Sequence, residues 1–296
     1  MDALNMPFQL LVSGLAMGSI YALVALGFVL VYVAVNVVNF AQGDFAMMGA
    51  FITFTLVSAL GLPIWIGLLV GVIVIGLFGY LFQLGVYRPF RNRKKAFLPV
   101  MISTLGASMV LQSVFLLIYG PYPQKLPTLF TVDTIKLGEV AISTQYLAIL
   151  GFALLLFLFQ YIFFEKTMIG KQMQATAQDP DTARLMGINV SRMHAITFIY
   201  CTALGGIAGI LVAPVFMITH TMGPMIGLKA FASAIVGGLS DVKGAIMGGL
   251  AIGVIETFAA AYISGPYKDA FAFLVLVLFL IFRPSGIFGE KVGQKA

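Results

Sequence analysis

The sequence predicts an all-α fold, a polytopic transmembrane helix bundle with about eight spans in a single domain over residues 1–296. Of these residues, 60% are hydrophobic and only 9% are charged, whereas a soluble domain carries roughly 25% charged residues. Charge-free stretches recur that match the roughly 20 residues a helix needs to cross a bilayer. Because lipid cannot satisfy backbone hydrogen bonds, each such stretch is expected to be helical.

Six candidate spans lie in the first three quarters of the chain. One long charge-free stretch counts as two spans, because the sequence Gly61-Leu62-Pro63 within it is typical of a turn. The spans cover residues 8–32, two runs within 45–87, and residues 98–119, 145–164 and 194–218.

The rest of the chain is less regular. Residues 231–240 lie between Lys229 and Asp241 and are too short to cross a bilayer alone, so a half-helix or re-entrant segment is expected there. Residues 244–263 and 270–282 are further candidate spans. One of the roughly eight crossings is therefore expected to be broken.

Lysine and arginine gather in three gaps between the apolar stretches. Because cytoplasmic loops are enriched in these residues, the three gaps and the C-terminus are expected on the cytoplasmic side. The net charge of +6 then reflects membrane topology, and no nucleic-acid partner is expected. The three clusters are Arg88, Arg91, Arg93, Lys94 and Lys95, then Lys166, Lys171, Arg184 and Arg192, and finally Arg283, Lys291 and Lys295.

An extracytoplasmic loop is expected at residues 120–144. Its stretch TVDTIKLGEVAI alternates like a small hairpin. Counting back three spans from Arg88 places the N-terminus outside as well, while the parity near residues 220–243 stays open.

A capped helix is predicted in the cytoplasmic segment 165–192, which contains GKQMQATAQDPDTARLMGINVSR. Asp179 is a suitable N-cap, Pro180 suits the first helical position, and Gly187 is a natural C-cap, so a helix of about two turns is expected between them. The segment is either an ordinary well-punctuated loop or a docking element that transmits a partner's motion to the attached spans.

Asn39, Gln42 and Asp44 form a polar cluster between apolar stretches. Ionisable groups at membrane depth are costly and usually face a cavity or a partner, so the cluster is a candidate for the translocation pathway. The interpretation given more weight is that Asp44 lies at the cytoplasmic interface and caps the following helix.

Glu256 and Lys229 are further pathway candidates. Glu256 lies inside an apolar stretch and needs a hydrogen-bond partner or a watery cavity. Lys229 adjoins the short segment and is expected to extend toward the membrane interface, although half-helix ends also meet charged solutes in transporters.

Glycine pairs four residues apart predict close helix packing. They are Gly14/Gly18, Gly67/Gly71, Gly205/Gly209, Gly244/Gly248 and Gly249/Gly253. Cys201 is the single cysteine, so a disulfide and a Cys-based metal site are excluded. No catalytic motif is present, and no enzyme activity, metal or cofactor is expected.

Four stretches resemble, in the same order, the permeases of branched-chain amino-acid ABC transporters of the LivH type. The cytoplasmic segment resembles their coupling loop, except that Gln174 stands where an arginine is expected. The other stretches are GSIYALVALGFVLVY with NFAQGDFAMMGAF, then GLKAFASAIVGGLSDVKGAIMGGLAIGVIE, and YKDAFAFLVLVLFLIFRPSGIFG. Tyr21, in the first of them, joins the pathway candidates.

The resemblance implies an inverted repeat and a multi-pass protein of a bacterial-type inner membrane. It implies as partners a second permease subunit in a heterodimer, two cytoplasmic ATPase subunits and an extracytoplasmic solute-binding protein, besides membrane lipid. The chain has no G-x-x-x-x-G-K-[ST] loop, so another chain must hydrolyse ATP. Coupling to the ATPase is assigned to Gly170, Lys171, Ala175, Asp179, Ala183, Gly187 and Ile188.

The expected function is translocation of branched-chain amino acids or a similar small polar solute such as urea or an amide. A secondary transporter or channel is the alternative, and it would place coupling-ion groups inside the membrane. Asp44 and Glu256 are its two ionisable candidates.

Overall fold

The computed structural model describes residues 2–90, 97–128, 130, 134–137, 140–283 and 286–288. Several basic residues that entered the orientation prediction lie outside the described residues, namely Arg91, Arg93, Lys94, Lys95, Lys291 and Lys295.

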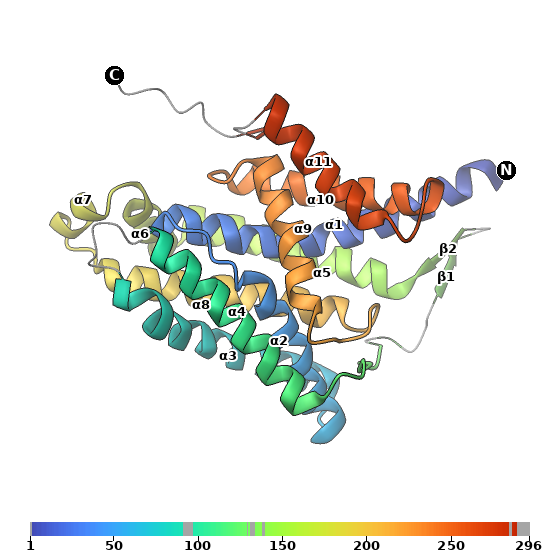
Figure 1. The fold of residues 1–296 in the computed structure, drawn as a ribbon, viewed down its shortest axis with the longest axis horizontal. Helices are drawn as coiled ribbons and strands as arrows, with labels where there is room; N and C mark the ends of the chain where they lie inside the picture. Colours follow the sequence, from blue (N-terminus) through green and yellow to red (C-terminus); the bar gives the residue numbers. More distant parts are fainter. Residues whose placement is uncertain are drawn as a thin grey trace.

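Helices and one hairpin make up the described part of the chain (Figure 1). The helices are α1 (Asp2–Val35), α2 (Gln42–Phe54), α3 (Ile64–Phe82), α4 (Phe97–Tyr119), α5 (Thr144–Lys166), α6 (Met168–Gln178), α7 (Pro180–Leu185), α8 (Val190–Val212), α9 (Met222–Gly237), α10 (Val242–Tyr262) and α11 (Lys268–Phe282). The strands are β1 (Thr134–Leu137) and β2 (Val140–Ser143), which pair antiparallel with Thr134 opposite Ser143. The helical fold class and the small hairpin are as predicted.

The bundle has two distinct ends (Figure 1). The short helices α6 and α7 lie at one end, which we call the α7 end. The hairpin of β1 and β2 lies at the opposite end, which we call the hairpin end.

Six of the described helices are long and apolar enough to cross a membrane, namely α1, α3, α4, α5, α8 and α10. The helices α2, α9 and α11 are shorter, with 13, 16 and 15 residues. The predicted break at Gly61-Leu62-Pro63 is confirmed, because helix α3 starts only at Ile64. Gly61 has a φ of +65°, a conformation that glycine adopts without steric cost.

The short helix α9 begins earlier than predicted. It starts at Met222 and not at residue 231, and it ends where Gly238 takes a φ of +118°. Lys229 does not interrupt it, because this lysine is buried and paired with carboxylates of other helices. The charge of Lys229 therefore does not mark the start of the helix.

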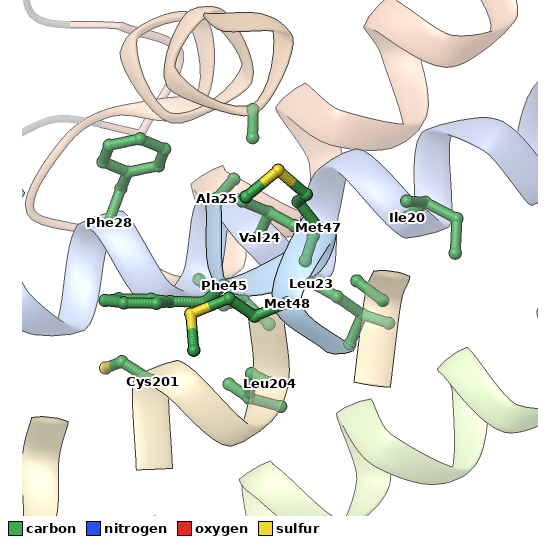
Figure 2. Close-up of a cluster of buried hydrophobic side chains, with 14 of the residues drawn as sticks. Ile20, Leu23, Val24, Ala25, Phe28, Phe45, Met47, Met48, Cys201 and Leu204 are labelled. Atoms are coloured by element: carbon green, nitrogen blue, oxygen red, sulfur yellow. The ribbon is translucent and has the colours of Figure 1, made fainter. Parts of the chain in front are cut away.

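Helix α1 forms the centre of the bundle. Every residue from 18 to 31 is buried, as expected for a helix that is apolar on all sides. It packs against α10, α8, α9 and α5. Figure 2 shows Leu23 of α1 near Phe45 of α2 and Leu204 of α8, whereas Phe28 points to the other side of α1, where it packs against Phe231 of α9.

The helices α3, α4 and α5 form an apolar outer surface. Leu69, Ile73 and Leu77 are exposed four residues apart on α3, and Leu117 of α4 and Leu154 of α5 are exposed as well. A surface of this kind is solvated by lipid, where no polar covering is required.

Glycines bring the buried helices into backbone contact, as predicted. A methyl group at Gly18 of α1 would lie 2.7 Å from the Cα atom of Leu250 in α10. One at Gly14 would lie 2.9 Å from the Cα atom of Val254 in α10. The same contact type joins Gly49 of α2 to Gly206 of α8, whose Cα atom would lie 2.7 Å from an added methyl group. Small residues at these crossings permit dense packing without a water-driven hydrophobic effect.

Candidate functional site

The helices α6 and α7 form a capped pair at the α7 end. The Thr167 hydroxyl accepts a hydrogen bond from the Gly170 N–H at 3.0 Å and caps α6. Asp179 caps α7 by accepting from the N–H groups of Asp181 and Thr182 at 2.9 and 3.2 Å. The Thr182 hydroxyl also donates to the Asp179 carboxylate, and this bond, together with the two backbone bonds, holds the pKa of the carboxyl below its usual range. The predicted capped helix is confirmed, and α6 adds a second one.

The end of α7 is a Schellman motif. The N–H of Ile188 donates to the carbonyl of Ala183, and the N–H of Gly187 donates to the carbonyl of Arg184, both at 3.0 Å. Gly187 has a φ of +83°. The three predicted residues Ala183, Gly187 and Ile188 therefore shape one turn.

The predicted coupling residues divide into buried and exposed ones. Gly170 and Ala183 are buried, and Gly170 packs against the backbone of Phe163 and Phe164. Lys171, Asp179 and Gly187 are exposed, while Ala175 and Ile188 are partly buried. The buried members set the shape of the pair, and the exposed members can contact a partner.

Two apolar side chains at the tip of α7 are almost fully exposed. Leu185 is 88% exposed and Met186 is 79% exposed. They were not among the residues predicted from the sequence, although they stand directly before the C-cap glycine Gly187. They can insert into an apolar groove of a partner.

A cavity of about 630 Å³ lies beneath α6, between α1, α5, α8 and α10. Gln174 and Ala177 of α6 line its wall. Gln160 of α5 also lines it, is 2% exposed, and finds no hydrogen-bond partner among the described residues for either polar side-chain atom. A shift of α6 would therefore change the shape of this cavity.

Tyr21, Lys229 and Glu256 meet inside the bundle. The Lys229 ammonium lies 2.6 Å from Oε1 of Glu256 and 3.4 Å from the Tyr21 hydroxyl. It also lies 2.6 Å from Oδ1 of Asp269. We call these four residues the Lys229 cluster, which links α1, α9, α10 and α11.

The expectation that Lys229 extends to the membrane interface is wrong. Its side chain is 8% exposed, and the carboxylates of Glu256 and Asp269 neutralise it within the bundle. Asp269 was not selected from the sequence, because it reads there as the start of an apolar span. The position of Asp269 in the first turn of the short helix α11 is the feature that could have indicated it.

A second cavity, of about 230 Å³, adjoins the Lys229 cluster toward the hairpin end. Tyr21, Lys229 and Asp269 line it together with Lys268. Apolar side chains supply most of the remaining wall, including Met217, Met222 and Met225.

Asn39 and Gln42 fasten the start of α2. The Asn39 side-chain oxygen accepts from the Ala41 N–H at 3.2 Å, and the Gln42 side chain donates to the Cys201 carbonyl of α8 at 2.9 Å. Both are buried and line neither the 230 Å³ nor the 630 Å³ cavity. Their described contacts are structural.

Asp44 does not cap α2 at an interface, contrary to the interpretation given more weight. It is the third residue of α2, is buried, and Ala41 occupies the N-cap position. Ser108 of α4 lies beside its carboxyl group, but neither carboxyl oxygen closes a hydrogen bond of good geometry. Gly223 of α9 covers the other side, where a methyl group would lie 2.5 Å from Oδ1.

No group of three His, Cys, Asp or Glu side chains that could hold a metal ion occurs among the described residues. Cys201 is buried, and its backbone carbonyl, described above, holds Gln42.

The arrangement defines a class of protein, a multi-pass α-helical membrane protein. Its fold is similar to that of a chain in a solved structure described as PsaBC from Streptococcus pneumoniae in complex with Fab. The TM-score is 0.51 and the sequence identity 14%, over 93% of this chain and 92% of that chain.

The sequence comparisons define the family. Residues 10–280 match the family described as the permease component of branched-chain amino acid transport systems. The chain is 34% identical to the high-affinity branched-chain amino acid transport system permease protein LivH of Salmonella typhimurium, over 97% of each chain. It is also 34% identical to the corresponding protein BraD of Pseudomonas aeruginosa, again over 97% of each chain.

The chain therefore belongs to the branched-chain amino acid ABC permease family. This confirms the resemblance noted in the sequence. Permeases of this family carry no ATPase domain and work with ATPase and solute-binding partners.

Proposed function

We propose that this chain forms the membrane pathway for a branched-chain amino acid in an importer driven by separate ATPase subunits. The observation that carries the proposal is the rigid pair of α6 and α7. Its exposed tip at Leu185 and Met186 is available to a partner, and its other side forms a wall of the 630 Å³ cavity. The printed names of the relatives support the solute class.

In this proposal, ATPase subunits bind the α7 tip together with Lys171, Asp179 and Gly187. Their movement passes through the buried contacts of Gly170 and Ala183, and through Ala175 and Ile188, to α5 and α8. Because the caps at both ends of α7 restrain its backbone, the pair would move as a unit.

The pathway side of the proposal rests on the Lys229 cluster. The 230 Å³ cavity is bordered by Tyr21 and Lys229, and Glu256 forms a hydrogen bond with Lys229. Buried ionisable groups in membrane proteins usually mark solute or ion pathways. Asn39, Gln42 and Asp44 act in the proposal as supports of α2 and of its crossing with α9.

We also infer a topology. If α2, α9 and α11 cross with the six longer helices, the chain crosses nine times, one more than the roughly eight expected from the sequence. An odd number places the two termini on opposite sides of the membrane, and the distribution of basic residues then places the N-terminus outside and the C-terminus in the cytoplasm.

An inverted repeat is supported by two long helices that are each followed by a short one. The first unit is α1 with α2, and the second is α8 with α9. Helix α1 runs toward the α7 end, whereas α8 runs away from it, so the units have opposite directions. The two short helices contact each other at Gly43 and Gly227, where the Cα atom of Gly227 would lie 2.6 Å from a methyl group at Gly43.

Reconstitution tests the function. Proteoliposomes that hold this chain with a second, different permease subunit, two ATPase subunits and the solute-binding protein should accumulate leucine when ATP is inside. This chain alone should accumulate none. Accumulation by the chain alone would overturn the proposal, and normal uptake without the second permease would overturn the heterodimer.

The orientation has its own test. Cys201 is buried, so a thiol reagent should not label the native chain in membranes. Cysteines placed at the exposed positions Lys125 and Met186 should be labelled from opposite sides of the membrane, Lys125→Cys from outside and Met186→Cys from inside. Labelling of both variants from the same side would exclude the proposed topology.

A further inference from the structure

The cavity at the hairpin end of the Lys229 cluster combines an apolar wall with charges of both signs. It is lined by the methionines Met17, Met217, Met222 and Met225 and by the polar groups of Lys229, Lys268 and Asp269. Its volume of about 230 Å³ is below the roughly 300–1,000 Å³ of sites for drug-sized ligands. A molecule no larger than an amino acid is therefore the appropriate size.

The Lys229 cluster contains one more acidic than basic side chain. Lys229 faces two carboxylates, each with an oxygen 2.6 Å from its ammonium, so one negative charge lacks a counter-charge within the cluster. The Asp269 side chain is 33% exposed and lines the cavity, so a cation in the cavity can reach it.

A separate positive charge lies at the same cavity. The Lys268 ammonium has no ion pair among the described contacts and lies 5.5 Å from the ring centre of Phe216, which also lines the cavity. Such a lysine can bind a carboxylate while its alkyl chain rests on apolar surface. The cavity is therefore lined by one acidic and one basic group that are consecutive in the sequence.

We propose that this cavity binds a zwitterionic amino acid with an apolar side chain. Asp269 binds the α-ammonium group, Lys268 binds the α-carboxylate, and the side chain lies among the four methionines. Methionine side chains are flexible and adapt to apolar groups of different shapes, so leucine, isoleucine and valine are all accepted. The identity of the solute rests on the proposed function, whereas the cavity and its charges are properties of the chain.

The test measures binding without the solute-binding protein, so that its selectivity does not enter. The complex of both permease subunits and the ATPase subunits is purified, and its thermal unfolding is followed with increasing leucine, leucinamide or 4-methylpentanoate. Leucinamide lacks the carboxylate and 4-methylpentanoate lacks the ammonium group. Leucine should raise the unfolding temperature at concentrations at least about tenfold lower than either analogue. A tenfold difference in affinity is what the loss of one charged contact is expected to cause.

Two variants separate the contacts. Lys268→Gln should weaken leucine binding about tenfold or more and leave leucinamide binding unchanged, while Lys268→Arg retains leucine binding. Asp269→Asn should weaken leucine binding and leave 4-methylpentanoate unchanged. Because Asp269 also contacts Lys229, the Lys268 variants keep the test valid if Asp269→Asn fails to fold. Lys125→Gln, an exposed lysine in the loop before β1, is the matched control and should bind leucine normally.

Equal stabilisation by leucine and both analogues, or unchanged leucine binding in both charge variants, would overturn the site. Absence of any leucine effect on the native complex would also overturn it. Each of these three results leaves the proposed function standing if proteoliposomes still import leucine, and failure of import is measured separately in that assay.

Discussion

The ammonium of Lys229 on α9 lies 2.6 Å from a carboxylate oxygen of Glu256 on α10, and both side chains are 8% exposed. The two residues are 27 positions apart in the chain. This ion pair, extended by the partly exposed Asp269 of α11, connects three helices. Removal of one member would leave a buried charge without its partner.

Replacement of Lys229 by glutamine should strongly destabilise the permease. The Glu256 carboxylate would remain buried without a cation, and loss of one partner of a buried pair costs about 3–5 kcal/mol. Thermal unfolding of the purified complex measures the effect. Lys171→Gln is the matched control, because the pair of Lys171 and Glu165 is about half exposed and contributes little. Equal effects of the two variants would show that the buried pair has no special role.

Alanine at Gly223 should weaken the packing of α2 against α9. Its methyl group would lie 2.5 Å from Oδ1 of Asp44 and 2.8 Å from the Cα atom of Asp44, and backbone cannot yield as a flexible side chain does. Overpacking of this kind costs about 1–3 kcal/mol. Gly151→Ala on α5 is the control, because nothing lies within 4 Å of an added methyl group there. That variant should be neutral or stabilising, since alanine favours a helix over glycine. Comparable unfolding temperatures for both variants would contradict the predicted close contact.

Valine at Gly187 should uncouple ATP hydrolysis from transport. Nothing lies within 4 Å of an added methyl group, so the effect would come from the φ of +83° alone. A residue other than glycine pays about 1–2 kcal/mol for this conformation, and a β-branched residue is the least tolerant. The ratio of ATP hydrolysed to leucine imported should rise. Gly187→Asn, which tolerates positive φ, should keep a nearly normal ratio. Unchanged coupling in the valine variant would remove Gly187 from the coupling assignment.

The cap of α7 should weaken in acid. The pKa of the Asp179 carboxyl is held below its usual range by the hydrogen bonds from Thr182 and Asp181. A lowered folded-state pKa means that the cap stabilises α7 above the ordinary aspartate pKa of about 3.9 and that this contribution disappears as the pH falls through the folded-state value. Amide exchange of Asp181 and Thr182 measures it.

Two substitutions complete this exchange experiment. Asp179→Ala should expose both amides at every pH, because no side-chain acceptor remains. Asp179→Asn should retain protection without the loss in acid, since asparagine caps but does not titrate in this range. A native protein whose protection does not fall in acid would contradict the titration of Asp179.

Local signals in the sequence predicted the parts of the structure that depend on neighbouring residues. The cap of α7 was predicted because Asp179, Pro180 and Gly187 act through their own backbone within one short segment. The break near Pro63 and the packing role of the glycine pairs followed from equally local rules. Family membership was also recognisable, because the stretches that carry it are contiguous.

The errors concern charges whose partners are distant in the chain. Lys229 was expected at the membrane interface, because its local sequence shows no acid, whereas Glu256 and Asp269 arrive from α10 and α11. Asp44 was interpreted as an interfacial cap, because its burial depends on α4 and on the absence of a side chain at Gly223.

The sequence by itself therefore determined the medium, the helical class, the caps and the family of this protein. Hydrophobicity, backbone propensity and contiguous motifs act over a few residues or over whole composition, so they can be read along the chain. Only the tertiary structure decided which ionisable groups meet and which cavities they border. Electrostatic pairing and packing act through space, and the Lys229 cluster exists only because α1, α9, α10 and α11 bring its members together.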